Sequence, residues 1–158
     1  MTSTEPLYHS VNWNLDYNLR LGKAWSRFMR GLQNQQLWAS RCDACDRTYV
    51  PPKSFCESCF EAVADEDWRQ VEPVGTIKAA TIVYQGFDGG PEAPYAVGAI
   101  EVDGTDTMLM HFVGGVDLTD AEGARTTIAP GTRVRAVWSQ SPDASITDIE
   151  HFVVDPSA

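Results

Sequence analysis

The sequence predicts a mainly β protein in which an N-terminal helix precedes a small four-cysteine module and a closed barrel of five strands. Three observations support this fold class: an apolar stripe at helical spacing, two C-x-x-C pairs in one window, and five strand-like segments separated by turn signals. The chain has 158 residues, of which 43% are hydrophobic and 22% are charged. These values are typical of one globular domain or of two very small modules that share a chain.

The segment 16–37 has the periodicity of an amphipathic helix. Large apolar side chains recur within one arc, and basic side chains occupy the opposite side. The apolar positions are Leu21, Trp25, Phe28, Met29 and Leu32. Gly31 and Asn34 weaken the last turns. Because so small a protein has little core to cover two large aromatic side chains, we expect this helix to take part in a protein interface.

All four cysteines lie in one 18-residue window. Cys42 and Cys45 form one C-x-x-C pair, and Cys56 and Cys59 form the other, with ten residues between the pairs. The two-residue spacing lets the backbone turn so that both sulfurs face one ion, and two pairs supply the four thiolates of a tetrahedral zinc site. We expect a short hairpin between the pairs. Four thiolates leave no open position for water, so the expected role of Zn²⁺ is structural.

Other uses of the cysteines are less favoured. The cytosol keeps thiols reduced, which argues against two disulfides, and no βαβ pattern surrounds the pairs as it would in a thioredoxin-like redox site. Iron in a rubredoxin-like site remains an alternative to zinc, because four thiolates alone do not distinguish the two metals.

Residues 1–10 lack the pattern of a signal peptide, and no apolar run reaches the roughly 20 residues that a bilayer requires. We therefore expect a cytoplasmic protein with no membrane partner.

From residue 68 onward the sequence has the pattern of β-structure. Residues 133–138 alternate polar and apolar side chains, as a half-buried strand does. The turn signal Asp103-Gly104 predicts a hairpin between two of the segments. Five strands suit a small closed barrel such as an OB-fold better than a sandwich, which commonly has about seven. The expected strands span 76–84, 95–102, 107–113, 133–139 and 146–153.

The charges are unevenly distributed along the chain. The net charge is −10, yet residues 20–53 contain seven Lys or Arg and two Asp. The rest of the chain has five basic and 20 acidic residues. Zinc ribbons and OB-folds both occur in proteins that bind single-stranded nucleic acid, which makes such a module one alternative function. So acidic a barrel has few cations to follow a phosphate backbone, and we therefore expect no nucleic-acid partner.

The order of a helix, a four-cysteine ribbon and a five-stranded barrel resembles the DUF35 family. That resemblance implies a rubredoxin-like zinc ribbon followed by an OB-fold barrel, with an N-terminal segment and helix at 1–39, the ribbon at 40–66 and the OB-fold at 67–158. The matching stretches are 41–45, 49–52, 56–59, 74–76, 94–97 and 130–134, with the closing Phe152. Asp46 stands where the family often has Gly, and neither pair contains the proline often seen there. Neither departure removes a ligand.

What the resemblance implies is a non-catalytic accessory subunit. Such proteins pair with a thiolase-like enzyme to form an acyl-CoA thiolase or aldolase, for example one that acts on benzoylsuccinyl-CoA or on steroid side chains, and help to bind or channel the acyl-CoA. The residues agree, because metal ligation leaves no cysteine as a nucleophile and no G-x-S-x-G elbow, P-loop or dinucleotide fingerprint is present. We expect no catalytic residue; a stand-alone acyl-CoA enzyme is the second alternative.

The basic residues inside the ribbon are candidates for binding coenzyme A. Arg47 and Lys53 both lie between the two cysteine pairs. Lys and Arg side chains make charge-assisted hydrogen bonds to phosphates. We therefore expect Arg47 and Lys53 to contact the phosphates of the CoA thioester.

Overall fold

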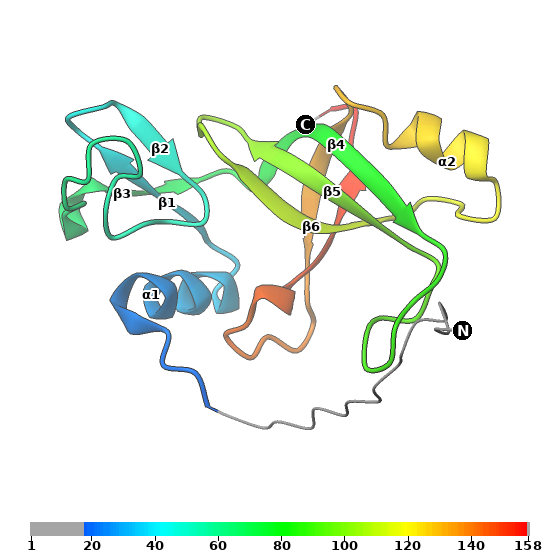
Figure 1. Ribbon diagram of the computed structural model, residues 1–158, viewed down its shortest axis with the longest axis horizontal. Helices are drawn as coiled ribbons and strands as arrows, with labels where there is room; N and C mark the ends of the chain where they lie inside the picture. Colours follow the sequence, from blue (N-terminus) through cyan, green and yellow to red (C-terminus); the bar gives the residue numbers. More distant parts are fainter. Residues whose placement is uncertain (1–17, 158) are drawn as a thin grey trace, which may run out of the picture.

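The computed structural model describes residues 18–157. In that range the chain forms a short N-terminal helix, a three-stranded ribbon and a five-stranded barrel, arranged side by side (Figure 1). In chain order the elements are α1 (Gly22–Gln33), β1 (Leu37–Cys42), β2 (Arg47–Tyr49), η1 (Asp65–Asp67), β3 (Trp68–Val71), β4 (Val74–Val83), β5 (Tyr95–Val102), β6 (Met108–Gly114), α2 (Ala121–Thr127), β7 (Arg133–Trp138), η2 (Ile146–Asp148) and β8 (Ile149–Val154). Neither of the two α-helices described here has the length and apolar character that crossing a bilayer requires.

Strands β4 to β8 close a barrel in the order β4-β5-β6-β8-β7. Strands β6 and β8 pair in parallel, with Val113 opposite Phe152, whereas the other neighbours are antiparallel. Strand β4 closes the barrel against β7, with Gly75 opposite Val134. A Cβ at Gly75 would clash with the carbonyl oxygen of Glu101, so only glycine admits this close approach. The closed five-stranded arrangement confirms the predicted OB-fold barrel.

One predicted strand is shorter than expected, and one helix was missed. The segment predicted as a strand at 146–153 begins with the 3₁₀ turn η2, and β8 starts only at Ile149. The buried carboxylate of Asp148 accepts backbone N–H groups from the three residues 143–145, which holds this segment in a turn rather than a strand. The helix α2 was not predicted, although Asp120 caps it by accepting a hydrogen bond from the N–H of Gly123.

The helix α1 is also shorter than the predicted 16–37, of which residues 16 and 17 lie outside the described part. It begins at Gly22, whose φ of 72° is left-handed. It ends before Asn34, whose side-chain amide donates to the carbonyl of Arg30. Only three residues then separate the end of α1 from Leu37, the first residue of β1.

The apolar stripe of α1 divides into a covered and an uncovered half. Phe28 and Leu32 are fully buried, whereas Leu21 and Trp25 remain 40% and 41% exposed. The chain itself therefore covers the C-terminal half of the stripe. A role for α1 in a protein interface stays a prediction.

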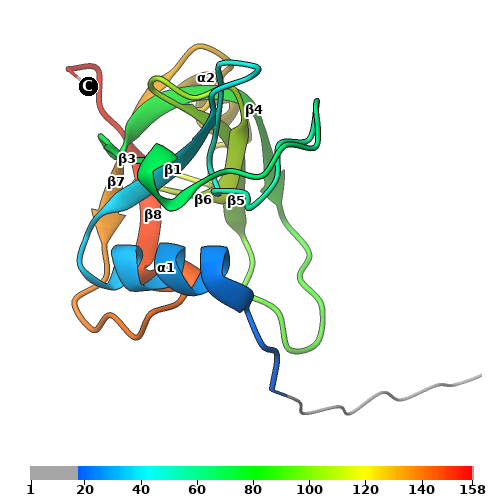
Figure 2. The ribbon, with the colours of Figure 1, turned by 90° about the vertical axis from the view of Figure 1, so that its left-hand side faces the viewer.

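The helix, the ribbon and the barrel share one apolar core. Phe28 and Leu32 of α1, Leu37 of β1 and Val50 after β2 belong to the same buried cluster as the inward side chains of the barrel. The barrel members are Ile77, Ala96, Ile100, Val102, Leu109, Val113, Ile128, Val134, Ala136, Ile149 and Phe152. Helix α1 packs against β1 and η2, and Figure 2 shows it running along one end of the barrel. The shared core fixes the ribbon on the barrel.

The predicted position of the hairpin in the ribbon is wrong. Strands β1 and β2 pair with Cys42 opposite Arg47, so the first C-x-x-C pair itself forms the hairpin turn. The segment between the pairs contains two consecutive prolines at 51–52, which cannot donate to a ladder. Strand β3 pairs with the other edge of β1. The sheet therefore extends beyond 40–66 on both sides, and the predicted division into three segments stays a prediction.

Candidate metal centre and basic groove

The four cysteine sulfurs converge at one end of the ribbon. The Sγ atoms of Cys42, Cys45, Cys56 and Cys59 lie within 4.8 Å of one another, and those of Cys42 and Cys59 are 3.6 Å apart. All four are free thiols rather than disulfides. A zinc–sulfur bond of about 2.3 Å in a tetrahedron places the sulfurs roughly 3.8 Å apart. The arrangement fits a single tetrahedral ion and brings together all four predicted ligands.

Two tight turns present the cysteine pairs. Asp46 has a φ of 54° and Phe60 a φ of 63°, so each pair is followed by a residue in the left-handed region. Glycine is favoured at such positions, but Asp tolerates them better than most residues. The guanidinium of Arg41 also holds Asp46, with Nη2 and Oδ1 2.7 Å apart. This geometry explains how an aspartate can stand where the family often has glycine.

The surroundings of the sulfurs favour ionising one of them. The hydroxyl of Tyr49 lies 3.1 Å from the Sγ of Cys56, and the N–H of Ser58 donates to the same sulfur at 3.4 Å. These donors, the Tyr49 hydroxyl first, lower the pKa of Cys56 to about 5. The pKa of Cys45 is raised to about 12, first by its hydrogen bond with Cys59 and then by burial. A cation bound between the sulfurs would supply the charge that ionises all four thiols together.

The two predicted phosphate-binding residues are engaged within the ribbon. Arg47 donates from Nη1 to the Oγ of Ser58 at 2.9 Å, and its guanidinium lies 5.8 Å from the ring centroid of Tyr49. Lys53 forms an ion pair with Glu57, with Nζ and Oε1 2.9 Å apart. Both side chains thus contact the segment that carries the second cysteine pair. Phosphate binding by either residue stays a prediction.

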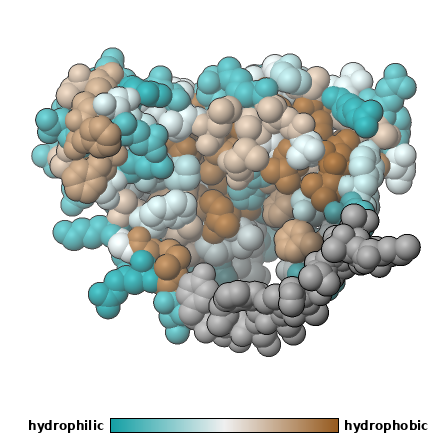
Figure 3. Space-filling view, viewed as in Figure 1, coloured by the Kyte–Doolittle hydropathy of each residue, from teal (hydrophilic) through white to brown (hydrophobic). Residues whose placement is uncertain are grey.

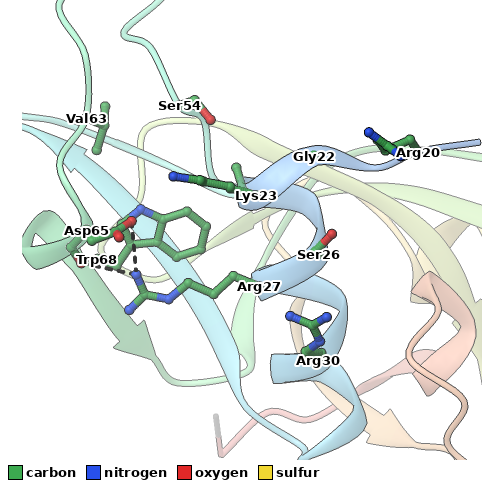
Figure 4. Close-up of a pocket in the computed structure, with 11 residues that line it drawn as sticks. Arg20, Gly22, Lys23, Ser26, Arg27, Arg30, Ser54, Val63, Asp65 and Trp68 are labelled. Atoms are coloured by element: carbon green, nitrogen blue, oxygen red, sulfur yellow. Dashed lines mark hydrogen bonds and ion pairs between the residues drawn. The ribbon is translucent and has the colours of Figure 1, made fainter.

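A groove of about 1040 Å³ lies between α1 and the loops of the ribbon. Its lining is rich in cations from α1 and the residues just before it. The charged and polar lining residues are Arg20, Lys23, Ser26, Arg27, Arg30, Ser54 and Asp65. Figure 4 shows Lys23 and Arg27 extending from α1 toward the ribbon segments that carry Ser54 and Trp68. We call this feature the α1 groove.

One cation of the α1 groove is fixed by the protein itself. Arg27 donates from Nη1 to the carbonyl of Asp65 at 3.1 Å and lies 3.8 Å from its carboxylate. The guanidinium also stacks on two rings, 4.5 Å from the centroid of Trp68 and 5.2 Å from that of Trp38. Sequence reasoning found the basic face of the helix but missed the groove, because Arg27 and Asp65 are 38 positions apart.

Comparisons with known proteins agree with this architecture. The family model described as the ChsH2 rubredoxin-like zinc ribbon domain matches residues 29–64, and that of the ChsH2 C-terminal OB-fold domain matches residues 68–139. A search of the curated proteins gave no match.

Two solved structures have the same fold. A DUF35-family protein of unknown function from Sulfolobus solfataricus superimposes with a TM-score of 0.61 at 20% identity, covering 85% of this chain and 87% of that chain. A chain of the Ltp2–ChsH2(DUF35) aldolase gives a TM-score of 0.59 at 19% identity, covering 89% of this chain and 100% of that chain. At such identities the structural likeness concerns the fold alone.

The two matching family models correspond to the two structural modules of the chain. The two domain models match in the order ribbon then barrel. The four cysteines that a zinc ribbon needs lie together, and the barrel closes with five strands. The chain carries the rubredoxin-like zinc ribbon and the C-terminal OB-fold domain of ChsH2-type proteins, and its fold is that of DUF35 proteins.

Proposed function

We propose that this chain is a non-catalytic accessory subunit that pairs with a thiolase-like enzyme in an acyl-CoA thiolase or aldolase complex. The match of both ChsH2 domains, over residues 29–64 and 68–139, carries the proposal. One similar structure is described as an Ltp2–ChsH2(DUF35) aldolase, in which the ChsH2 fold occurs together with a second protein. That association supports a subunit role for the present chain.

The side-chain chemistry supports a role without catalysis. The cysteines serve the metal, which removes the strongest nucleophiles. Both ring nitrogens of the buried His111 are occupied, Nε2 by the carbonyl of Ile146 at 3.1 Å and Nδ1 by the N–H of Phe112 at 2.9 Å. Among the hydrogen bonds of residues 18–157, none joins a Ser, Thr or Cys side chain to a histidine. The nucleophile and the base would therefore come from the partner.

Reconstitution with a partner tests this function. The zinc-loaded chain is co-expressed with the thiolase-like protein whose reading frame lies nearest in its genome, and the mixture is separated by size-exclusion chromatography. We expect one hetero-oligomeric peak, and turnover of an acyl-CoA only when both chains are present. Turnover by this chain alone would identify a stand-alone enzyme instead. Separate elution of the two chains, with no gain in the partner's activity, would contradict an accessory role.

A further inference from the structure

We propose that the C-terminal half of β4 binds an extended, acidic peptide segment of another protein, which joins the barrel as an additional strand. The site is a groove of about 400 Å³ between this half of β4 and the α2 region, and we call it the β4 groove (Figure 1). The inference goes beyond the proposed function, because no lining residue of the β4 groove belongs to the metal centre or to the α1 groove.

The first argument is the free edge of β4. Strand β7 pairs with β4 only at Val74–Thr76, and beyond it the backbone of Ile77 bonds to Thr132 and Gly131. Strand β5 pairs with all of 79–83 on one side. Among residues 18–157, no backbone group pairs with 79–83 on the other side. The second half of β4 is therefore an edge strand, although its first half closes the barrel.

The register shows which backbone groups face the free edge. Asp103 donates its N–H to the carbonyl of Val74, so the odd-numbered residues of β5 face β4. After the bulge in β4, their partners are the odd-numbered residues of 79–83. Ala80 and Ile82, between them, therefore direct their N–H and C=O groups away from β5. An extended peptide supplies donors and acceptors at the same two-residue spacing, which is how it adds to a sheet edge.

The second argument is the absence of protection along this edge. Residues 79–84 include no charged residue, proline or glycine, the features that commonly keep other strands away from an edge. The charge of Lys78, just before them, is paired with Glu101 at 2.8 Å. Ile128 and Pro130 add apolar surface from the opposite wall. Figure 3 shows hydrophobic side chains gathered over this part of β4, between β5 and α2.

The third argument is the charge of the β4 groove. Arg125 is the only charged residue that lines it. Among residues 18–157, no ion pair or hydrogen bond engages the Arg125 side chain. The whole chain has a net charge of −10, yet this groove has a cation and no carboxylate. A guanidinium without a partner beside a strand edge favours a peptide that carries a carboxylate.

The shape of the site favours a peptide over other occupants. Because the α2 region forms the opposite wall, the groove admits a single strand more readily than the sheet edge of a second barrel. A volume of about 400 Å³ lies within the range of about 300–1,000 Å³ that is typical of ligand sites. Single-stranded nucleic acid requires cations along its length, and this groove provides one.

Amide hydrogen exchange of the zinc-loaded full-length chain, followed by NMR, tests strand addition. The probe is a synthetic peptide of alternating threonine and valine with one central glutamate and uncharged ends. We expect the bound peptide to slow exchange at Ala80 and Ile82 by at least about tenfold. The amides of Ala79, Thr81 and Val83 already pair with β5 and should change little. Absence of binding, or equal protection of all five amides, would overturn the proposal.

A modified peptide tests whether the main chain carries the binding. A version with N-methyl groups at alternate residues keeps the side chains but cannot donate to the edge, and it should not bind. Binding of this version as tightly as the parent peptide would refute strand addition. Protection of Ala80 and Ile82 that rises with protein concentration, without any peptide, would assign the edge to a second copy of this chain and overturn the peptide site.

A charge swap tests the preference for an acidic peptide. The peptide with lysine in place of the glutamate should bind at least about tenfold more weakly, because Arg125 repels it. Arg125→Gln should lose this preference, whereas Arg30→Gln on α1 is the matched control and should keep it. Equal affinity of the two peptides for the wild type would refute a site for acidic peptides.

A backbone variant locates the site on β4. Ala80→Pro removes one N–H from the free edge, where proline is tolerated, and should weaken binding of the glutamate peptide by at least about tenfold. Urea denaturation checks that the variant is folded, and the N-methylated peptide provides the same test on the wild type if it is not. Normal affinity of a folded Ala80→Pro variant would refute pairing at this edge.

Discussion

The metal end of the ribbon and the interior of the barrel are stabilised in different ways. Among residues 18–157, the buried cluster at the metal end contains only Cys42, Tyr49 and Cys56, with Cys45 packed against it. The barrel interior is lined by large aliphatic and aromatic side chains such as Ile100 and Phe152, both fully buried. The ribbon therefore depends on a cation where the barrel depends on apolar burial.

The ribbon and the barrel should therefore respond to different perturbations. Leu37 and Val50 tie the ribbon to the barrel core, so the ribbon has two anchors, one apolar and one metallic. Loss of the metal removes only the second anchor. The barrel has no such dependence, because its strands pair all the way round.

Removal of the metal should destabilise the ribbon more than any single substitution destabilises the barrel. Structural zinc supplies on the order of 10 kcal/mol of folding free energy in small zinc modules. A strong chelator should therefore unfold the two cysteine turns, residues 42–47 and 55–63, while β5 and β6 stay protected, as measured by hydrogen–deuterium exchange with and without the chelator. Cys59→Ser should have the same effect, whereas the neighbouring Ser58→Ala should retain the metal. Unchanged protection of these two turns after metal removal would mean that the ribbon has an apolar core of its own.

Truncation of a side chain in the barrel core should cause the second largest loss of stability. Phe152 is fully buried in β8, so Phe152→Ala should lower the free energy of unfolding by about 3–5 kcal/mol. Met110 lies on β6 but is 62% exposed, so Met110→Ala should change it by less than about 0.5 kcal/mol. Urea denaturation of the zinc-saturated proteins measures both. Similar losses for the two variants would contradict the assignment of Phe152 to the buried core and of Met110 to the surface.

The turn before β8 provides a smaller effect. The Asp148 carboxylate accepts the N–H groups of Asp143, Ala144 and Ser145 at 2.8, 3.0 and 3.3 Å. Asp148→Asn leaves one oxygen to accept them and should cost about 1–3 kcal/mol by the same urea measurement. The exposed Asp143→Asn serves as control, since only its backbone joins this network. Equal stability of the Asp148 variant and the wild type would show that the carboxylate is dispensable.

The smallest effect is a pH dependence from His111. Burial lowers the pKa of His111 below its usual 6.5, and the nearby His151 adds to the shift. The folded state thus favours the neutral ring, so this contribution to stability is complete above pH 6.5 and is lost as the pH falls toward the lowered pKa. His111→Gln should flatten the slope of unfolding free energy against pH below 6.5, relative to wild type. Parallel slopes for the two proteins would contradict this assignment.

The barrel strands were predictable because their signal is local. In β7 the side chains at Val134 and Ala136 are buried and Arg135 between them is exposed, as the alternation in the sequence indicates. The start of β8 was not predictable from hydrophobicity, because an apolar residue such as Ile146 can occupy either a 3₁₀ turn or a strand. The turn-forming pair, Ser145 and Asp148, was the signal that a pattern based on apolar residues overlooks.

The fold places the basic residues in two different surroundings. Arg47 and Lys53 lie close to the cysteines, and the fold engages both with ribbon side chains. Lys23 and Arg30 belong to a helix far from the cysteines in the sequence, yet they line an open groove beside the ribbon. The difference arises from the packing of α1 on β1, which no local pattern encodes.

Short-range spacing was enough to predict that the four cysteine sulfurs converge, because a C-x-x-C turn directs both sulfurs to one side whatever surrounds it. The same holds for the strands of the barrel, whose alternation repeats every two residues. Only the folded chain decides which cations are paired and which face open space, because ion pairs and grooves form between segments that are distant in sequence. Residues close together in the sequence therefore specify the cysteine site, whereas the α1 groove forms only when segments distant in the sequence pack together.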